Sequence, residues 1–230
     1  MAEIGNGYGS ELHLLRFLGR HREHLNQKVL EVVGGSAVRW LDFQFDLSRK
    51  MWQDAEWKGL GFLPDGEPAK ADWPMFWPQK GNVPNWDAVG LIATGRGEEW
   101  LLVEAKAHLG ELRSSCGAKS DSGLNQIKQA LDRTKQALGV SPSCDWLKSY
   151  YQYCNRLAVL NFLNSCGTPA RLLLIHFLGD SVPGKECPQN EKGWAQALEA
   201  QDQHIGLPRN HPLADRIHKL FLPVAGKETK

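Results

Sequence analysis

The chain has 230 residues, of which 42% are hydrophobic and 23% are charged, and its formal net charge is only +1. A chain of this length can bury a substantial core, and we expect residues 1–230 to form one large α/β domain. A net charge this close to zero neither attracts nor repels a polyanion strongly, so binding of nucleic acid would depend on local patches. The sequence starts without a basic segment followed by an apolar run, and no stretch of about 18 apolar residues occurs. We therefore expect a cytoplasmic protein that does not enter a membrane.

The five cysteines form an odd set without a C-x-x-C pair. This pattern argues against a zinc ribbon and against a secreted disulfide framework. The sequence therefore predicts reduced structural thiols.

The first expected element is an amphipathic helix over about 10–33, which has Ser10 near its start and Gly34-Gly35 after its end. The segment 36–63 has no clean period, and we expect one strand within it. Proline and glycine are frequent from Pro64 to Pro84, which predicts a long loop with a functional role. The loop's aromatic residues either pack over the sheet, which is the interpretation we favour, or wall a substrate groove.

Two β-like runs, 86–94 and 100–107, flank the turn-rich sequence GRGEE and predict a hairpin. Two helices are expected next, one capped by Ser122 and ending at Gly139, and one over about 144–164. The apolar run ARLLLIHFLGD then fits a strand buried on both faces, as parallel strands usually are. The tail from Pro183 is polar and broken until IHKLFLPV, which predicts an edge strand or a helix end.

The hairpin carries the candidate site, which consists of Asp87, Glu104 and Lys106. Glu104 and Lys106 are two residues apart in WLLVEAKAH, so their side chains leave the strand on the same face. If the hairpin loop is the four residues 95–98, Asp87 lies opposite Lys106 and diagonal to Glu104. A register shift of one residue would turn Asp87 to the other face.

The apolar residues that precede Glu104 place these charges at the end of a strand that is otherwise buried, where charges must be paired or coordinated. Two carboxylates suit Mg²⁺, or Mn²⁺ in its place, and the main-chain carbonyl of Ala105 offers a further oxygen ligand. Lys106 would orient or deprotonate a water molecule and offset charge on a phosphate. The competing interpretation is an ordinary strand pair at a solvated edge, because an Asp followed at a distance by E-x-K is common by chance.

The sequence PNWDAVG, a turn, and WLLVEAKAH together resemble the core of the PD-(D/E)XK nuclease superfamily, with Asn85-Trp86 inserted between Pro84 and Asp87. The resemblance covers about 84–180. It implies a restriction endonuclease-like three-layer sandwich, in which a mixed central sheet is flanked by helices. It also implies that Asp87 and Glu104 bind the metal, that Lys106 is the catalytic lysine, and that the substrate is a nucleic acid, with DNA the one we expect.

Further site residues are expected on the helices and beside the hairpin. Members of the superfamily often carry an acidic residue on the first helix, and Glu11 is the candidate metal ligand of this kind. The helix after residue 144 presents Gln152, Asn155 and Arg156 on one face, with Gln152 expected in the catalytic centre and the other two at a phosphate. Gln126 and Gln129 are the rival polar residues for this role, and Trp86 is expected to stack on a base.

Two alternatives to a DNA endonuclease or exonuclease remain open. The first is a catalytically inactive module of the same fold that binds nucleic acid or a protein partner, which the near-neutral charge and the aromatic segment favour. The second is a different hydrolase, toxin or defence component built on the same site. The oligomeric state is not predicted.

Overall fold

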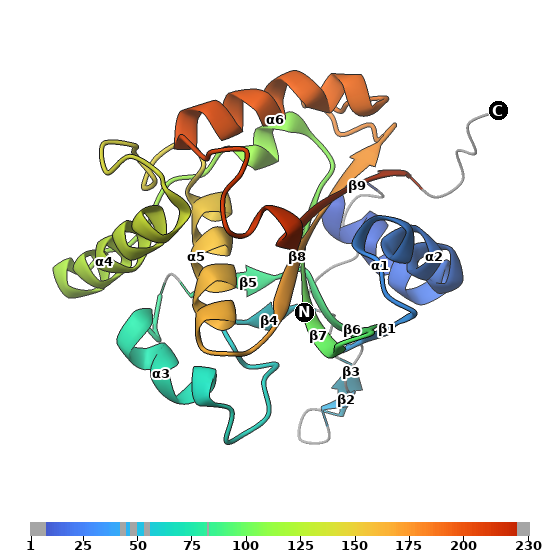
Figure 1. Cartoon of the computed structure of the whole chain (residues 1–230). Helices are drawn as coiled ribbons and strands as arrows, with labels where there is room; N and C mark the ends of the chain where they lie inside the picture. Colours follow the sequence, from blue (N-terminus) through green and yellow to red (C-terminus); the bar gives the residue numbers. More distant parts are fainter. Residues whose placement is uncertain (1–7, 42–44, 47–49, 53–55, 82, 225–230) are drawn as a thin grey trace.

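The centre of the protein is a five-stranded mixed sheet with the strand order β1-β6-β7-β8-β9. The computed structural model describes residues 8–41, 45–46, 50–52, 56–81 and 83–224 (Figure 1). The strands of the sheet are β1 (Ala37–Trp40), β6 (Ala88–Thr94), β7 (Gly97–Lys106), β8 (Ala170–Leu178) and β9 (Ile217–Pro223). The β1, β6 and β7 strands are antiparallel, and β7, β8 and β9 run parallel. β7 is therefore the central strand, hydrogen-bonded on both sides.

Helices pack against both faces of this sheet. They are α1 (Ser10–Arg20), α2 (Arg22–Val33), α3 (Pro68–Phe76), α4 (Asp121–Leu138), α5 (Tyr151–Ser165) and α6 (Glu191–Ile205). Side chains along β7 alternate: Leu101 and Val103 join the core under α1 and α2, whereas Leu102 joins the core under the other helices. Figure 1 shows α1 and α2 on one side of the sheet and α4, α5 and α6 on the other. The predicted α/β architecture with a mixed sheet and flanking helices is thus confirmed.

The remaining elements are short. They are β2 (Phe45–Asp46), β3 (Met51–Trp52), β4 (Trp57–Lys58), β5 (Asn85–Trp86), and two 3-10 turns, η1 (Leu109–Leu112) and η2 (Ala214–Arg216). β2 pairs with β3, and β4 pairs with β5. The predicted strand within 36–63 corresponds to β1, and parts of that segment (42–44, 47–49 and 53–55) lie outside the described residues.

The β6–β7 hairpin exists, but its predicted register was wrong by two residues. Thr94 pairs with Gly97 rather than Glu99, so the turn is the two residues 95–96. Gly97 has a φ of 115°, a backbone conformation that glycine adopts readily. Asp87 itself lies at a bend just before β6, outside this paired register, where its N–H donates to the carbonyl of Val103 at 3.1 Å and its carboxylate accepts the N–H of Ala105.

Three helices differ from the predictions at their boundaries. The single helix predicted over 10–33 is broken at His21, and the side chain of Arg22 donates from Nε to the freed carbonyl of Leu18 at 2.7 Å. The cap of α4 is Ser120, whose hydroxyl accepts from the N–H of Gly123, rather than the predicted Ser122. α5 starts at Tyr151, later than expected.

Two helices lie where none was predicted. α3 occupies the segment predicted as a loop. Its Pro68 stands in the first turn, where the missing N–H costs nothing, and Trp73 stacks on Trp77 with ring centroids 6.1 Å apart. α6 occupies the tail predicted as broken, capped by Asn190 and ended by left-handed Gly206. The IHKLFLPV segment forms β9, which is the edge strand of the two predicted alternatives.

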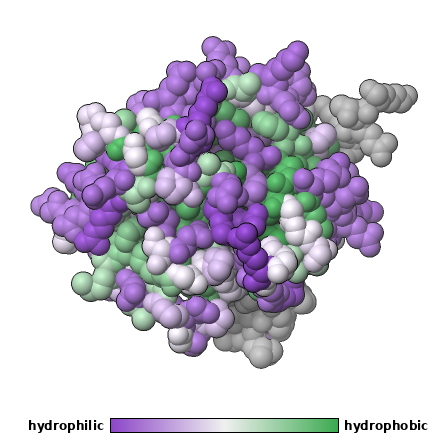
Figure 2. Space-filling view, in the orientation of Figure 1, coloured by the Kyte–Doolittle hydropathy of each residue, from purple (hydrophilic) through white to green (hydrophobic). Residues whose placement is uncertain are grey.

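One face of the protein is seen in the space-filling view (Figure 2). Hydrophilic residues cover most of the face seen in Figure 2, and hydrophobic ones lie in patches between them. No helix in the described part of the chain is long and apolar enough to span a membrane. All five cysteines are free thiols, as predicted.

Candidate active site

The site forms where the end of β7 faces α5. Glu104 is only 4% exposed, and both of its carboxylate oxygens have cationic partners. The ammonium of Lys106 donates to Oε1. Arg156 of α5 approaches Oε2 with Nε at 2.7 Å and Nη2 at 2.6 Å. These short charge-assisted contacts tie the end of the central strand to α5.

Asp87 precedes β6 and brings a second carboxyl to this cluster. Its Oδ2 accepts the backbone N–H of Ala105 at 2.6 Å, and among the described residues no hydrogen bond reaches Oδ1. Burial, together with the neighbouring charge of Glu104, raises the pKa of Asp87 to about 7, although Lys106 and Arg156 act in the opposite direction. The positive charges of Lys106 and Arg156 therefore do not fully offset the effect of burial and of Glu104 on the Asp87 carboxyl.

The other two members of the predicted trio are charged. Burial works to raise the pKa of Glu104, but Arg156 and Lys106 outweigh it and hold that pKa below its ordinary value. Burial likewise works to lower the pKa of Lys106, and the carboxylates of Glu104 and Asp87 outweigh it and raise it. Lys106 is therefore an ammonium at neutral pH, which donates hydrogen bonds and does not accept a proton.

A divalent cation fits this group as a partly hydrated ion. The N–H and carbonyl of one residue leave a strand on the same side, so the Ala105 carbonyl faces the edge at which its N–H meets Asp87. Asp87, Glu104 and this carbonyl would supply the oxygen ligands. Within the described ranges no group of three or more His, Cys, Asp or Glu side chains converges to hold a metal. Carboxylate and carbonyl oxygens are donors of the kind that Mg²⁺ uses, and both oxygens of Glu104 are paired with Lys106 and Arg156 in this structure.

The residues expected to bind substrate lie inside the protein instead. Arg156 is 2% exposed, and besides Glu104 it donates from Nη1 to Asn155 Oδ1 at 2.7 Å and from Nη2 to the carbonyl of Asn85. Trp86 is fully buried beneath the guanidinium, 4.8 Å from ring centre to Cζ, and its indole N–H donates to the carbonyl of Gly59 at 2.9 Å. In this conformation these three residues hold Glu104 in place and do not face a ligand, because their polar groups are engaged within the core.

Gln152 lies next to the cluster of Glu104, Lys106 and Arg156. It lines a cavity of about 20 Å³ together with Glu104, Lys106 and Arg156. A cavity of this size has room for about one water molecule. The rival Gln126 instead donates to the carbonyl of Pro74 at 2.8 Å on the surface.

Glu11 is exposed at the start of α1, and a different carboxylate enters the site from nearby. Glu111 lines the cavity, accepts the Ser10 hydroxyl at Oε1 over 2.8 Å, and accepts the backbone N–H groups of Ala107 and His108 at Oε2. The predicted role of Glu11 as a ligand stays a prediction, with no contact to the cluster among the described residues.

Sequence analysis also missed His176 and Gln201, which line the same cavity and are buried. His176 pairs with Lys106 in the β7–β8 register. Burial, with the charges of Lys219 and Lys106, lowers the pKa of His176 to about 3, so its ring is neutral. A histidine within the apolar run ARLLLIHFLGD was a usable signal, because such a run otherwise excludes polar side chains.

Comparisons of the chain with protein-family models, with curated proteins and with solved structures found no match. The geometry of the site and the chemistry of its residues are therefore the basis for a functional proposal.

Proposed function

We propose that this protein is a Mg²⁺-dependent nuclease that hydrolyses phosphodiester bonds in nucleic acid, with DNA as the favoured substrate, on a restriction endonuclease-like scaffold. The observation that carries the proposal is the Asp87 carboxyl, which accepts the backbone N–H of Ala105 next to Glu104 and whose pKa is raised to about 7 by burial and by the charge of Glu104. Placed beside a charged Glu104 and a charged Lys106, this carboxyl forms a site that a divalent cation would complete.

In this proposal Asp87, Glu104 and the carbonyl of Ala105 hold Mg²⁺. The bound ion would supply Lewis-acid polarisation of a phosphoryl oxygen and a more acidic water. Lys106, held as an ammonium, donates hydrogen bonds to a phosphate oxygen or to the water and offsets negative charge that builds up during the reaction. Gln152 lies in the adjoining cavity, where its amide can orient the same water.

Arg156 has a positioning role in this proposal. It donates from Nε to Oε2 of Glu104, its Nη2 lies 2.6 Å from the same oxygen, and its Nη1 donates to Asn155. A charge-assisted contact of this kind, with Lys106 on the other oxygen, fixes the position of the carboxylate. Arg156 therefore orients Glu104 for the metal, and it does not touch the substrate.

The second candidate is a non-catalytic module that binds nucleic acid or protein, and the cluster's own charge balance favours it. Two cations, Lys106 and Arg156, already face two carboxylates, Glu104 and Asp87. Such a network can stabilise a fold without any ion. This candidate predicts binding that does not depend on a divalent cation.

The test is a cleavage assay on mixed single- and double-stranded DNA and RNA with Mg²⁺, with a chelator as the control. We expect Lys106→Met and Asp87→Asn to lower the rate by roughly 10²- to 10⁴-fold, the range for removal of a group that acts in the transition state. Cleavage by both variants at the wild-type rate would remove the assigned site. Absence of cleavage by the wild type, with binding intact, would favour the second candidate.

A further inference from the structure

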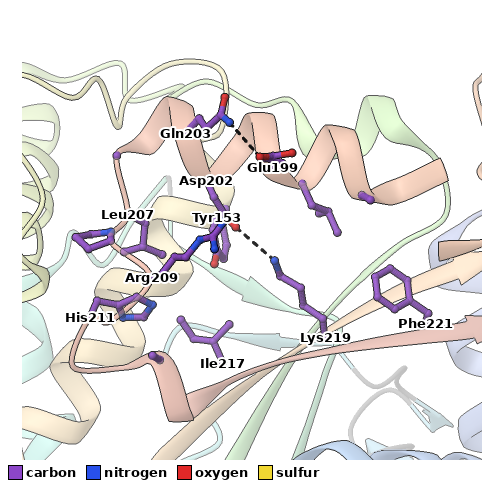
Figure 3. Close-up of a pocket in the computed structure, with 15 residues that line it drawn as sticks. Tyr153, Glu199, Asp202, Gln203, Leu207, Arg209, His211, Ile217, Lys219 and Phe221 are labelled. Atoms are coloured by element: carbon purple, nitrogen blue, oxygen red, sulfur yellow. Dashed lines mark hydrogen bonds and ion pairs between the residues drawn. The ribbon is translucent and has the colours of Figure 1, made fainter. Parts of the chain in front are cut away.

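A pocket with a volume of about 750 Å³ lies beside the candidate active site. Three segments enclose it: α6, the loop that follows α6, and β9 (Figure 3). Tyr153 of α5 lies behind them. A cavity of this volume is in the range of sites that take a small organic molecule.

Acidic and basic side chains enter the pocket from different elements. Glu199 and Asp202 come from α6, one turn apart, whereas Arg209 and His211 come from the following loop and Lys219 comes from β9. Asp202 lies among the basic side chains, beside Lys219, whereas Glu199 lies away from Arg209 and His211. A ligand with a donor group near Glu199 and an anionic group near Arg209 would match this arrangement.

One of these cations is uncommitted. Lys219 already contacts Asp202, with Nζ 3.4 Å from Oδ2, so this pair is neutral as a unit. Arg209 is exposed, and the described residues include no acceptor within hydrogen-bonding distance of its guanidinium. His211 accepts the N–H of Leu213 at Nδ1 over 3.2 Å, which leaves Nε2 as its remaining donor. Arg209 and His211 can therefore both donate to an anion.

Apolar and aromatic side chains also line the pocket: Tyr153, Leu198, Ile217 and Phe221. Burial raises the pKa of Tyr153, so its phenol remains neutral. Flat side chains of this kind give a stacking surface to a planar ring whatever the ring's hydrogen-bonding pattern.

The pocket adjoins the candidate active site. Tyr153 lines both the pocket and the small cavity that contains Glu104 and Lys106. Phe221 of the pocket lies 5.4 Å, between ring centroids, from His176 of that small cavity. A ligand in the pocket would thus be separated from the catalytic cavity by a single layer of side chains.

We propose that this pocket binds a nucleotide whose base carries an exocyclic amine. The amine donates to Glu199, the base lies against apolar and aromatic lining residues such as Ile217 and Phe221, and the phosphate is bound by Arg209 and His211. The nucleotide is either a unit of a strand that is cleaved in the adjacent active site or a free mononucleotide. The first of these sources rests on the proposed nuclease function, and binding itself does not.

The test is calorimetric titration of the protein with deoxyadenosine monophosphate in the presence of a chelator, so that cleavage plays no part. We expect Arg209→Ala to weaken binding by about tenfold or more, because it removes a charge-assisted contact to phosphate. Arg20→Ala is the matched control, since Arg20 is also exposed but lies on α1, across the sheet from α6. Deoxyadenosine and inorganic phosphate should each bind more weakly than the nucleotide.

The inference is overturned if the nucleotide does not bind, if Arg209→Ala binds it as tightly as Arg20→Ala, or if phosphate alone binds equally well. Titration with a short single-stranded oligonucleotide separates the two sources. If Arg209→Ala weakens binding of the oligonucleotide, the pocket binds a unit of the strand. If the affinity for the oligonucleotide is unchanged, the pocket binds a free nucleotide. A wild type that cleaves DNA but fails the nucleotide titration would reject the pocket and leave the nuclease proposal standing.

Discussion

The central strand β7 carries a buried glutamate at each end, and the two are paired in similar ways. Glu99, 5% exposed, accepts at Oε2 from Nε of Arg171 at 2.6 Å and from Nη1 of Arg216 at 2.8 Å. Glu104 at the other end accepts from Lys106 and Arg156. Burial opposes ionisation at both, and the basic partners outweigh it, so the pKa of each glutamate lies below its ordinary value.

The difference between the two ends is Asp87. Among the described residues, both partners of Glu99 are arginines and no second carboxylate approaches. At the other end a second carboxyl faces the same cations, and its pKa rises to about 7. A buried ion pair alone is common in structural roles. A second carboxyl whose negative charge is not fully balanced by nearby cations, as at Asp87, is the feature that would attract a cation. The comparison therefore separates an ion pair that supports the fold from a site suited to chemistry.

The largest effect on stability is expected for Arg156→Met. This change keeps much of the aliphatic stem but leaves Glu104 buried with Lys106 as its remaining cation, so the free energy of unfolding should fall by about 3–5 kcal/mol. Urea unfolding followed by circular dichroism measures the change. A loss below about 1 kcal/mol would mean that Arg156 does not hold Glu104.

The matched change at the other end, Arg171→Met, should cost less, about 1–2 kcal/mol, because Arg216 remains paired with Glu99. Arg171 also donates from Nη1 to the carbonyl of Val33 at 2.9 Å, and this contact is included in that cost. The same urea experiment applies. Equal losses at the two ends would show that both clusters are structural ion pairs of one kind.

A smaller effect, of opposite sign, is expected for Asp87→Asn. An acid whose pKa is raised by folding binds more protons in the folded state, so its contribution to stability is present below pH 4 and is lost as the pH rises to about 7. Without a divalent cation, the variant should be more stable than the wild type by about 1–2 kcal/mol at pH 8 and equal to it near pH 4. Thermal unfolding across this range measures the difference. A gain that does not depend on pH would contradict the raised pKa.

The hairpin and its face could be predicted because they depend on local information. Alternation predicted that Glu104 and Lys106 share a face of β7. Asp87 lies at a bend just before β6, outside the paired register, and joins the site through the N–H of Ala105, a contact that neither the alternation nor the turn length predicted. The turn length itself was not predictable from GRGEE, where two glycines each permit a turn.

The partners of these residues could not be predicted because they lie far away in the chain. We expected Arg156 to bind a phosphate because we considered the sequence of its helix without the packing of that helix on the sheet. Its contact with Glu104, 52 residues earlier, depends on how α5 docks on the sheet. α3 was missed because its prolines were read as breakers, although Pro68 stands where a helix tolerates proline. α6 left a readable signal in its buried Trp194, Leu198 and Ile205, and missing it concealed the pocket that α6 encloses.

The most direct test of the central claim is calorimetric titration of Mg²⁺ at pH 8 into the wild type, Asp87→Asn and Glu99→Gln, each shown by circular dichroism to be folded. The account predicts a saturable isotherm for the wild type, the same isotherm for Glu99→Gln, and binding at least tenfold weaker for Asp87→Asn, because only the Asp87 end of β7 offers an undercompensated carboxylate. Equal binding by Asp87→Asn and the wild type, or no binding by the wild type, would contradict it.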